Sequence, residues 1–464
     1  MSPRKLIVLT ALVLALFAFV YLFERKMPTT GERLQKGDLV WELPEDHIES
    51  VRLERPGGTV ELARSGPASW RLVKPDPYPA DSAAVSDIVS QLARLRRSGG
   101  DAAEAKPEDY GFKSPSAKAT ISWKDDAKPG KKLSRTLEFG IEIPGTEATA
   151  ARAAGTSVVF FVPTTLAFAV RKAPDEFKSK EVFSAPASDA ARLDVDRGRG
   201  RLSLAKKDGS WWLRQPLNDL AESVEVDKLI GSLTALRALE FLPQPQGQGL
   251  ASFGLAPPLF HVVLADAKGP GTSVDFGSTR SDGNSVYARR ENQVFTVAST
   301  VVEDLSREAE TYREPHLVRF DRGAVTQLDG EFAHASFSIT RKDGGWSFAG
   351  RPSTAPSVDD LLTALLDVKG KAFAEEAAAR ALASRQPAAT VTIRLSVGDP
   401  WTIKLYPRGT EAPAIVIGRP GAFLLGSDPV PNLEAAFQKA AAPPPATSPA
   451  AATSLTVPPA PPKK

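Results

Sequence analysis

The residues that could do chemistry are few in this sequence and far apart. The chain has 464 residues, with four histidines and no cysteine. Histidine-based metal sites place two or more of these residues at short spacing, as in HExxH. No such spacing joins His47, His261, His316 and His334. We therefore expect four ordinary surface or hydrogen-bonded histidines and no metal site.

Other catalytic patterns are also missing. The sequence has no GxxxxGK[ST] loop for nucleotide phosphates and no GxSxG nucleophile elbow. The glycine-rich stretch 269–285 falls between expected strands and is interpreted as a hairpin loop. Two carboxylate pairs, Asp359-Asp360 and Glu375-Glu376, lie on or near expected helices, where neighbouring side chains diverge by about 100°. We predict solvated carboxylates, no catalytic or cofactor-binding residue, no cofactor, and no enzyme activity.

Two groups of arginines could meet an anion. The residues are Arg94, Arg96, Arg97 and Arg197, Arg199, Arg201. The first group flanks an expected helix end, where cations are favoured, and the second reads as a hairpin with solvent-facing arginines. Binding of acidic lipid headgroups or of an anionic polymer is the alternative. A net charge of +3 does not indicate a nucleic-acid-binding face.

The clearest physical signal is an uncharged apolar stretch from Leu6 to Phe23. Its 18 residues span roughly 27 Å as a helix, close to the hydrocarbon thickness of a bilayer. Arg4 and Lys5 precede it, which favours a cytoplasmic N-terminus and export of the remaining chain. A cleaved signal peptide or a buried soluble helix is the alternative, but no small-x-small site follows the stretch. We predict a single-pass anchor.

The elements beyond the anchor repeat. A glycine-containing turn followed by tryptophan and a proline-ended strand occurs three times, in SGPASWRLVKP, KKDGSWWLRQP and RKDGGWSFAGRP, and the turn is charged in the last two. We align Trp70, Trp212 and Trp346 and expect each indole to lie in a core beneath a helix. A length of 464 residues predicts two to four domains.

An amphipathic helical pattern follows each tryptophan. The apolar positions recur with spacing i, i+3, i+7, i+10, as on the buried face of a helix. They are Val85, Ile88, Leu92, Leu95; Val226, Leu229, Leu233, Leu236; and Val358, Leu361, Leu365, Val368. Ser82, Ser223 and Ser357 stand near the expected helix starts, where a hydroxyl can cap free amide groups.

The expected architecture is α+β: an N-terminal transmembrane helix and three tandem repeats of an antiparallel sheet with helices packed on one face. We predict a cytoplasmic end at 1–5, the anchor at 6–23, a linker at 24–46, repeats at 47–184, 185–320 and 321–439, and a disordered Pro/Ala-rich tail at 440–464. A Pro-rich peptide ligand is the alternative for the tail.

The repeats resemble the domain-of-unknown-function 4340 family. The likeness rests on the W-x-L-x-x-P phrase, the helix, the aromatic-Gly turns in EDYGFKSP and ASFGLAPP, and strands such as TLEFG and SVDFG. It covers residues 48–438, although the third repeat lacks the aromatic-Gly turn. The resemblance implies a bacterial envelope protein, often encoded beside ABC-type transporter components of the gliding-motility type, and carries over no catalytic residue.

Together these features predict a non-enzymatic, membrane-anchored extracytoplasmic (periplasmic) scaffold. We expect it to be an accessory subunit of an ABC-type transport or gliding-motility-like envelope complex, with membrane proteins as partners and no nucleic acid or metal. A cell-envelope glycan-binding module is the alternative, and exposed coplanar aromatic residues would favour it. A cryptic envelope hydrolase is the third hypothesis and would need a deep acidic cleft.

Overall fold

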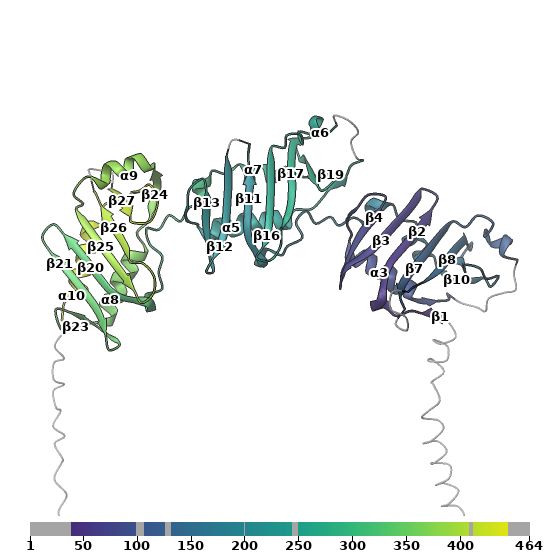
Figure 1. The fold of residues 1–464 in the computed structure, drawn as a ribbon, viewed down its shortest axis with the longest axis horizontal. Coiled ribbons are helices and arrows are strands. Elements are labelled where there is room, and N and C mark those ends of the chain that lie inside the picture. The colour runs from purple at the N-terminus through teal and green to yellow at the C-terminus, as the bar shows by residue number, and fades with distance from the viewer. Residues whose placement is uncertain are drawn as a thin grey trace, which may run out of the picture. The chain divides into compact units, whose positions relative to one another are not determined.

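The computed structural model describes residues 39–98, 106–125, 131–198, 200–243, 249–407 and 412–443. Strands hold 44% of these residues and helices 25%. The strands form four sheets (Figure 1), and their neighbouring strands run antiparallel. The protein is therefore mainly antiparallel β in the part that the structure describes.

This composition corrects the expected class. We predicted an α+β protein, with a transmembrane helix followed by sheets that each carry helices on one face, and that prediction is wrong. A 12-residue amphipathic stripe is easy to see in a sequence, whereas strands of two to six residues, such as β5 or β13, carry little period-two signal. The predicted anchor at 6–23 lies outside the described residues. No helix in the described ranges is long and apolar enough to cross a membrane.

A two-stranded sheet and an eight-stranded sheet come first. The two-stranded sheet pairs β1 (Leu39–Glu42) with β6 (Arg94–Arg96). The eight-stranded sheet contains β2 (Ile48–Arg55), β3 (Gly58–Gly66), β4 (Ser69–Lys74), β5 (Tyr78–Pro79), β7 (Ala117–Lys124), β8 (Lys132–Glu142), β9 (Ala148–Ala153) and β10 (Phe160–Pro163).

Two nine-stranded sheets follow. One contains β11 (Ala190–Asp196), β12 (Arg201–Lys207), β13 (Ser210–Gln215), β14 (Asp219–Leu220), β15 (Glu240–Phe241), β16 (Phe260–Asp266), β17 (Thr272–Thr279), β18 (Ser285–Arg290) and β19 (Gln293–Ala298). The other contains β20 (Val325–Phe332), β21 (Ser336–Lys342), β22 (Gly345–Phe348), β23 (Arg351–Ser353), β24 (Gly370–Ala374), β25 (Ala389–Leu395), β26 (Trp401–Leu405), β27 (Ala412–Val416) and β28 (Ala422–Leu425).

Helices join the strands at matching points of the chain. The α-helices are α3 (Ser82–Ala93), α4 (Thr164–Arg171), α5 (Ser223–Ala235), α6 (Gly249–Ser252), α7 (Thr300–Ser306), α8 (Ala355–Leu366), α9 (Glu376–Ala383) and α10 (Val430–Ala441). The short 3-10 helices are η2 (Glu45–His47), η3 (Pro107–Tyr110), η4 (Pro174–Phe177), η5 (Ala187–Asp189), η6 (Ala309–Tyr312) and η7 (Arg322–Ala324).

The three large sheets share one strand order. In each, the first four strands lie in reverse sequence order, and the four that follow the long helix continue from the first strand outward, as in β23-β22-β21-β20-β25-β26-β27-β28. β15 and β24 add a ninth strand beside β19 and β28, whereas the equivalent β6 pairs with β1. The sheets therefore repeat one topology. The domain bounds given above stay predictions.

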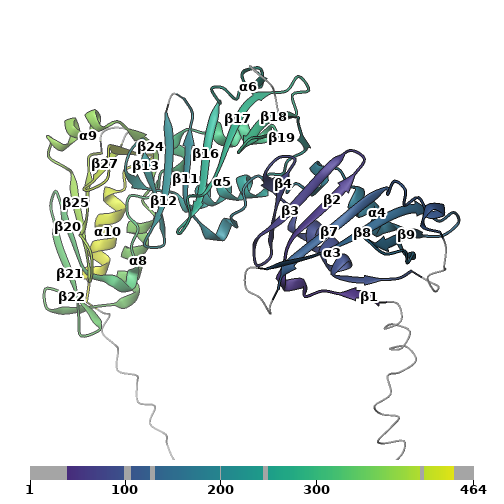
Figure 2. The same ribbon diagram turned by 45° about the vertical axis from the view of Figure 1, so that its right-hand side comes forward.

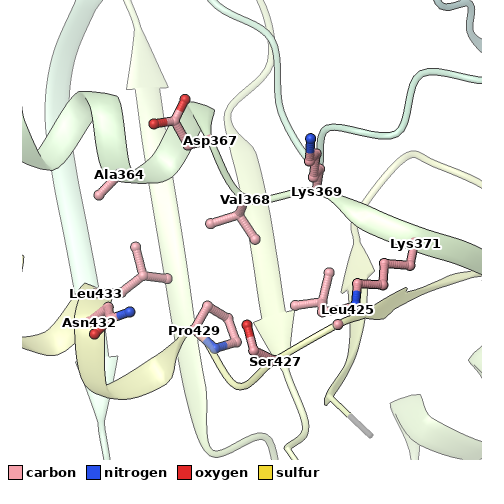
Figure 3. A pocket seen from close by; sticks show the side chains of 11 residues that line it. Ala364, Asp367, Val368, Lys369, Lys371, Leu425, Ser427, Pro429, Asn432 and Leu433 are labelled. Atoms are coloured by element: carbon pink, nitrogen blue, oxygen red, sulfur yellow. The ribbon is translucent and has the colours of Figure 1, made fainter.

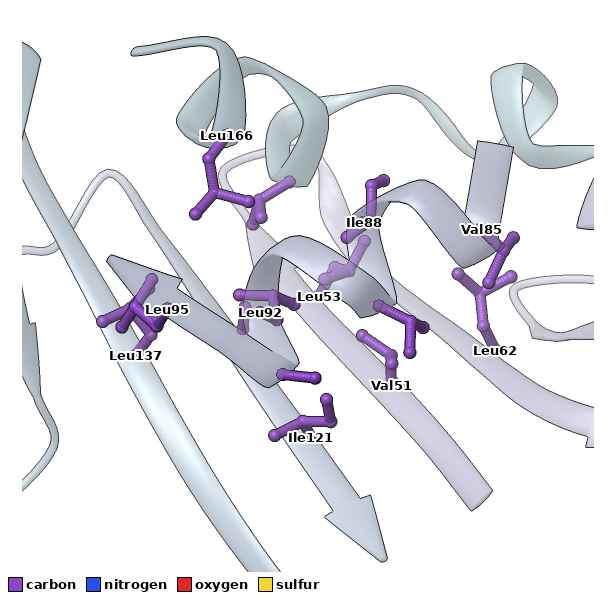
Figure 4. Packing of buried hydrophobic residues seen from close by; sticks show 14 of the residues in the cluster. Val51, Leu53, Leu62, Val85, Ile88, Leu92, Leu95, Ile121, Leu137 and Leu166 are labelled. Carbon is purple, nitrogen blue, oxygen red and sulfur yellow. The ribbon is translucent and has the colours of Figure 1, made fainter. Parts of the chain in front are cut away.

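The chain divides into two compact units. Within the described ranges, the first holds residues 39–184, 235–258 and 274–299, and the second holds residues 185–234, 259–273 and 300–443. The main core of the first unit brings Val85, Ile88 and Leu92 of α3 against Val51 and Leu53 of β2 (Figure 4). In the second unit α8 and α10 lie beside each other (Figure 2).

Helix starts differ from the expected hydroxyl caps. Asp81 caps α3, because its carboxylate accepts hydrogen bonds from the backbone amides of Ala83 and Ala84 at 3.1 Å. The hydroxyl of Ser82 instead accepts a bond from the Trp70 amide at 3.1 Å. Ser357 lies inside α8, two residues past its start. The first three residues of each predicted stripe lie in the helices, whereas the fourth residues, Leu95, Leu236 and Val368, lie beyond the helix ends. Neither Ser82 nor Ser357 is the N-cap residue of its helix.

One tryptophan occupies the same position in the first hairpin of each large sheet. In the second of these sheets this residue differs by one position from the sequence alignment. Trp70, Trp211 and Trp346 pair across the hairpin with basic residues, so Trp211 and not Trp212 is the equivalent residue. The cations lie over the indoles at 4.7 Å for Arg64–Trp70, 5.7 Å for Lys206–Trp211 and 5.7 Å for Arg341–Trp346. Trp70 and Trp211 are buried, while Trp346 is half-buried against its core.

The aromatic-Gly turns and the glycines of the LEFG and VDFG strands form one structure. A Cβ on Gly140 would lie 2.0 Å from the Tyr110 carbonyl oxygen, and one on Gly277 would lie 2.1 Å from that of Phe253. The third repeat lacks the turn and carries Tyr406 after its equivalent strand. The turn and the strand glycine therefore occur together because the turn packs directly on the strand backbone.

Candidate functional site

The four histidines belong to different segments of the chain. His47 ends η2, His261 is in β16, and His334 is exposed between β20 and β21. His316 alone lies in a potential cation-binding group among the described residues, with Glu222 and Glu314. Their ligand atoms all fall within 4.8 Å of one another. Sequence spacing missed this group because Glu222 comes from a segment distant in the chain.

The group already contains a positive charge. Glu314 Oε1 lies 2.7 Å from His316 Nδ1, and Glu314 Oε2 lies 3.0 Å from Arg319 Nε. Arg319 Nη2 is also 3.0 Å from His316 Nδ1. Glu222, Glu314 and His316 are the described residues that could hold a metal ion, but Arg319 already forms an ion pair with the Glu314 carboxylate.

The carboxylate pairs do not converge. Asp360 forms an exposed ion pair with Lys439 at 2.6 Å. Glu376 accepts a hydrogen bond from the Gly421 amide at 2.8 Å and lies 3.8 Å from Arg380. Asp360 and Glu376 therefore form ion pairs and a backbone contact within the second unit.

A buried charge cluster in the second unit is the most distinctive polar feature. Asp219 of β14 lies 2.5 Å from Arg313 Nε and 2.7 Å from Arg419 Nε, and all three side chains are at least nine-tenths buried. Arg313 also lies 4.0 Å from the Phe373 ring and Arg419 4.5 Å from the Phe423 ring. Burial lowers the pKa of the Arg313 guanidinium, while the hydrogen bond that Arg313 donates to Asp219 opposes that shift.

Arg419 also binds the connecting segment that follows β19 and α7. Its Nη1 donates to the carbonyls of His316 at 2.5 Å and Leu317 at 3.1 Å, and its Nη2 donates to that of Glu314 at 2.7 Å. Buried charge needs this many partners, since each unpaired hydrogen-bonding group would cost about 1–3 kcal/mol. The cluster therefore fixes the segment against β14 and the β27–β28 turn.

The first unit contains an equivalent arrangement of buried cations around a connecting segment. Arg290 Nη1 donates to the carbonyls of Glu181 at 3.3 Å and Val182 at 3.1 Å. Lys178 Nζ lies over the Phe241 ring at 5.2 Å, in the same way that Arg313 lies over the Phe373 ring at 4.0 Å. The bridges Ala80–Lys178 and Ala221–Arg313 place both cations at the same point of the topology. We call the arrangement of Lys178 and Arg290 in the first unit the lysine joint. The arrangement of Asp219, Arg313 and Arg419 in the second unit is the arginine joint.

The structure also shows where the two arginine groups noted in the sequence lie. Arg94, Arg96 and Arg97 follow α3, and the first two belong to β6, which was not predicted as a strand. Arg201 begins β12 and lies 3.2 Å from Asp194. Arg197 lies in the turn before β12, and the structure of Arg199 lies outside the described residues.

The second unit also has an open pocket of about 400 Å³ between α8, β24 and α10 (Figure 3). Val368, Leu425 and Leu433 provide an apolar floor, and Lys369 and Lys371 stand at its rim. Lys371 folds over Gly426, where a Cβ would lie 2.1 Å from its Cε. The pocket brings no nucleophile and base together, and Asp367 is its one carboxylate.

These features define a class: an array of repeated antiparallel sheets whose connections are fixed by buried cations. Two overlapping stretches, 70–248 and 243–387, match the model of the domain of unknown function DUF4340. The chain belongs to this family. The first match runs from Trp70 in β4 to the residues after β15, and the second runs from there to the residues before β25, so each spans a connection between sheets. No curated protein matches the chain.

Proposed function

We propose that the protein is a non-enzymatic scaffold held at the outer side of a membrane, as an accessory subunit of an ABC-type transport or gliding-motility-like complex. The observation that carries this proposal is the repeated joint. Arg290 and Arg419 each bind two consecutive carbonyls of a segment that connects successive sheets. Buried charges that bind the connecting segments hold those segments in one conformation, as a scaffold requires.

The sequence of residues 6–23 supports attachment to a membrane. Its 18 uncharged residues have the length of a membrane-spanning helix, and Arg4 and Lys5 favour a cytoplasmic start. The extracytoplasmic location of the repeats follows from that orientation. We treat the location and the anchor as parts of the proposal.

The transport role rests on the family and on a missing motif. The family resemblance implies a protein that is often encoded beside ABC-type transporter components of the gliding-motility type. This chain has no phosphate-binding GxxxxGK[ST] loop. Partner subunits would supply ATP hydrolysis. The glycan-binding alternative lacks comparable support, because Trp70 and Trp211 are buried and carry cations over their rings.

The test is a purification from solubilised membranes through a tag on the C-terminal end. We expect ATP hydrolysis to copurify with the full chain and to be lost when residues 6–23 are replaced by an equally long polar linker. A matched control replaces the Pro/Ala-rich stretch 444–464 instead, which should leave the copurifying activity unchanged. Full chain purified from membranes free of ATPase activity would contradict the proposal.

A further inference from the structure

We propose that Arg197 and Arg201 form a binding site for the carboxylate or phosphate group of a small water-soluble organic ligand. The site is a pocket of about 360 Å³ that lies wholly within the second unit. It lies at the turn before β12, near the end of α7. Its lining includes Pro216, Phe260 and Glu308 beside the two arginines.

The guanidinium of Arg197 is the main evidence. Its Nε and Nη2 are both shielded from water, and neither has a hydrogen-bond partner. These two nitrogens form the edge of the guanidinium that binds a carboxylate or phosphate with two parallel bonds. Burial lowers the pKa of this arginine, as expected for a charge that is held at an energetic cost, while Glu308 opposes that shift. An anion in the pocket would remove that cost after a small turn of the side chain.

The surroundings indicate the size and character of the ligand. Arg201 adds a second positive charge, although Asp194 lies 3.2 Å from it and neutralises part of that charge. Phe260 and Pro216 offer an apolar wall to the same space. An oxyanion joined to a small apolar body, such as an aromatic ring, fits both halves of the pocket.

Two other residues make the inference testable. Glu308 lines the pocket and places a negative charge near Arg197, so it should weaken the binding of an anion. Arg55 occupies the equivalent turn of the first large sheet, and its Nε is likewise buried without a partner. It does not line this pocket. Arg55 therefore provides a matched control for arginine loss at this turn.

The experiment uses the full chain purified in detergent, with phenyl phosphate and benzoate as probes and benzyl alcohol as the neutral analogue. Calorimetry should show saturable binding of both anions and none of the alcohol. Arg197→Gln should weaken binding by about ten- to a hundredfold, as expected for loss of charged hydrogen bonds. Arg55→Gln should leave it unchanged, and Glu308→Gln should strengthen it.

A stability measurement separates a binding arginine from a structural one. Without ligand, Arg197→Met should raise the melting temperature, because it removes a buried charge that has no partner. The variant should also lose the stabilisation that phenyl phosphate gives the unchanged protein. A lower melting temperature of Arg197→Met would overturn the proposal. So would absent anion binding, equal binding by Arg197→Gln, or weaker binding by Glu308→Gln.

Discussion

Asp219 Oδ1 lies 2.7 Å from Nε of Arg419, although the two residues are separated by 200 positions in the chain. Both side chains are buried, and Nε of Arg313 lies 2.5 Å from Oδ2 of the same carboxylate. One carboxylate thus serves two buried guanidinium groups. This relationship makes Asp219 the residue on which the arginine joint depends most.

Asp219→Asn should therefore be costly. The substitution leaves two buried cations without their counter-ion, a change that costs about 3–5 kcal/mol in comparable sites. Urea unfolding should show this loss of stability. Hydrogen exchange at the Glu314 amide, which donates to the Leu220 carbonyl at 3.0 Å, should become faster.

The matched control for that variant is Asp360→Asn. Asp360 forms an ion pair with Lys439, and the two side chains are 61% and 63% exposed. Loss of this pair should therefore cost at most about 1 kcal/mol of unfolding free energy. Equal effects of the two substitutions would show that the arginine joint contributes no more than a surface ion pair.

Tyr78 predicts a pH dependence in the first unit. Burial raises the pKa of its phenol to about 12, with Arg290 opposing the shift. The unfolded chain ionises at about pH 10, so stability is unaffected by this group below pH 10 and falls between pH 10 and 12. The loss across that window should be about 3 kcal/mol.

Tyr78→Phe provides the comparison. The Tyr78 hydroxyl is buried without a hydrogen-bond partner, so its removal should be neutral or stabilising at pH 8. Urea unfolding at pH 8 and pH 11.5 should show a smaller decrease for the variant than for the unchanged protein. An identical decrease in both would assign the alkaline instability to other groups.

The glycines beneath the aromatic-Gly turns should resist substitution. Gly140→Ala or Gly277→Ala would push a Cβ to within about 2 Å of a backbone carbonyl oxygen. Overpacking of this kind costs about 1–3 kcal/mol, and thermal unfolding should show it. Gly231→Ala is the control, since nothing lies within 4 Å of its Cβ position inside α5. It should stabilise the helix by up to about 1 kcal/mol.

Much of the repeat could be predicted from the sequence. The hairpin that carries Trp70, the apolar stripe of α3 and the strand glycine Gly140 are local patterns that the chain shows directly. The register of Trp211 was misjudged by one residue, because two adjacent indoles give the same hydrophobic signal. The β class was underestimated, since two-residue strands such as β14 are formed by pairing and not by local composition.

The polar sites depend on distant segments. Asp219, Arg313 and Arg419 come from three regions, and no spacing rule joins them. Arg197 was noticed as part of a basic cluster, but its significance lies in two nitrogens without partners, which are visible only after folding. Sequence reasoning therefore identified the repeated frame and missed the contacts that hold its connections.

The location of the repeats tests the central claim most directly. Intact spheroplasts that contain the full chain should be treated with protease before and after the membrane is disrupted. A scaffold on the outer side predicts cleavage of the exposed loops between residues 39 and 443 while the membrane is intact, with a cytoplasmic marker protein left uncut. Protection of these residues until the membrane is disrupted would contradict the proposed function.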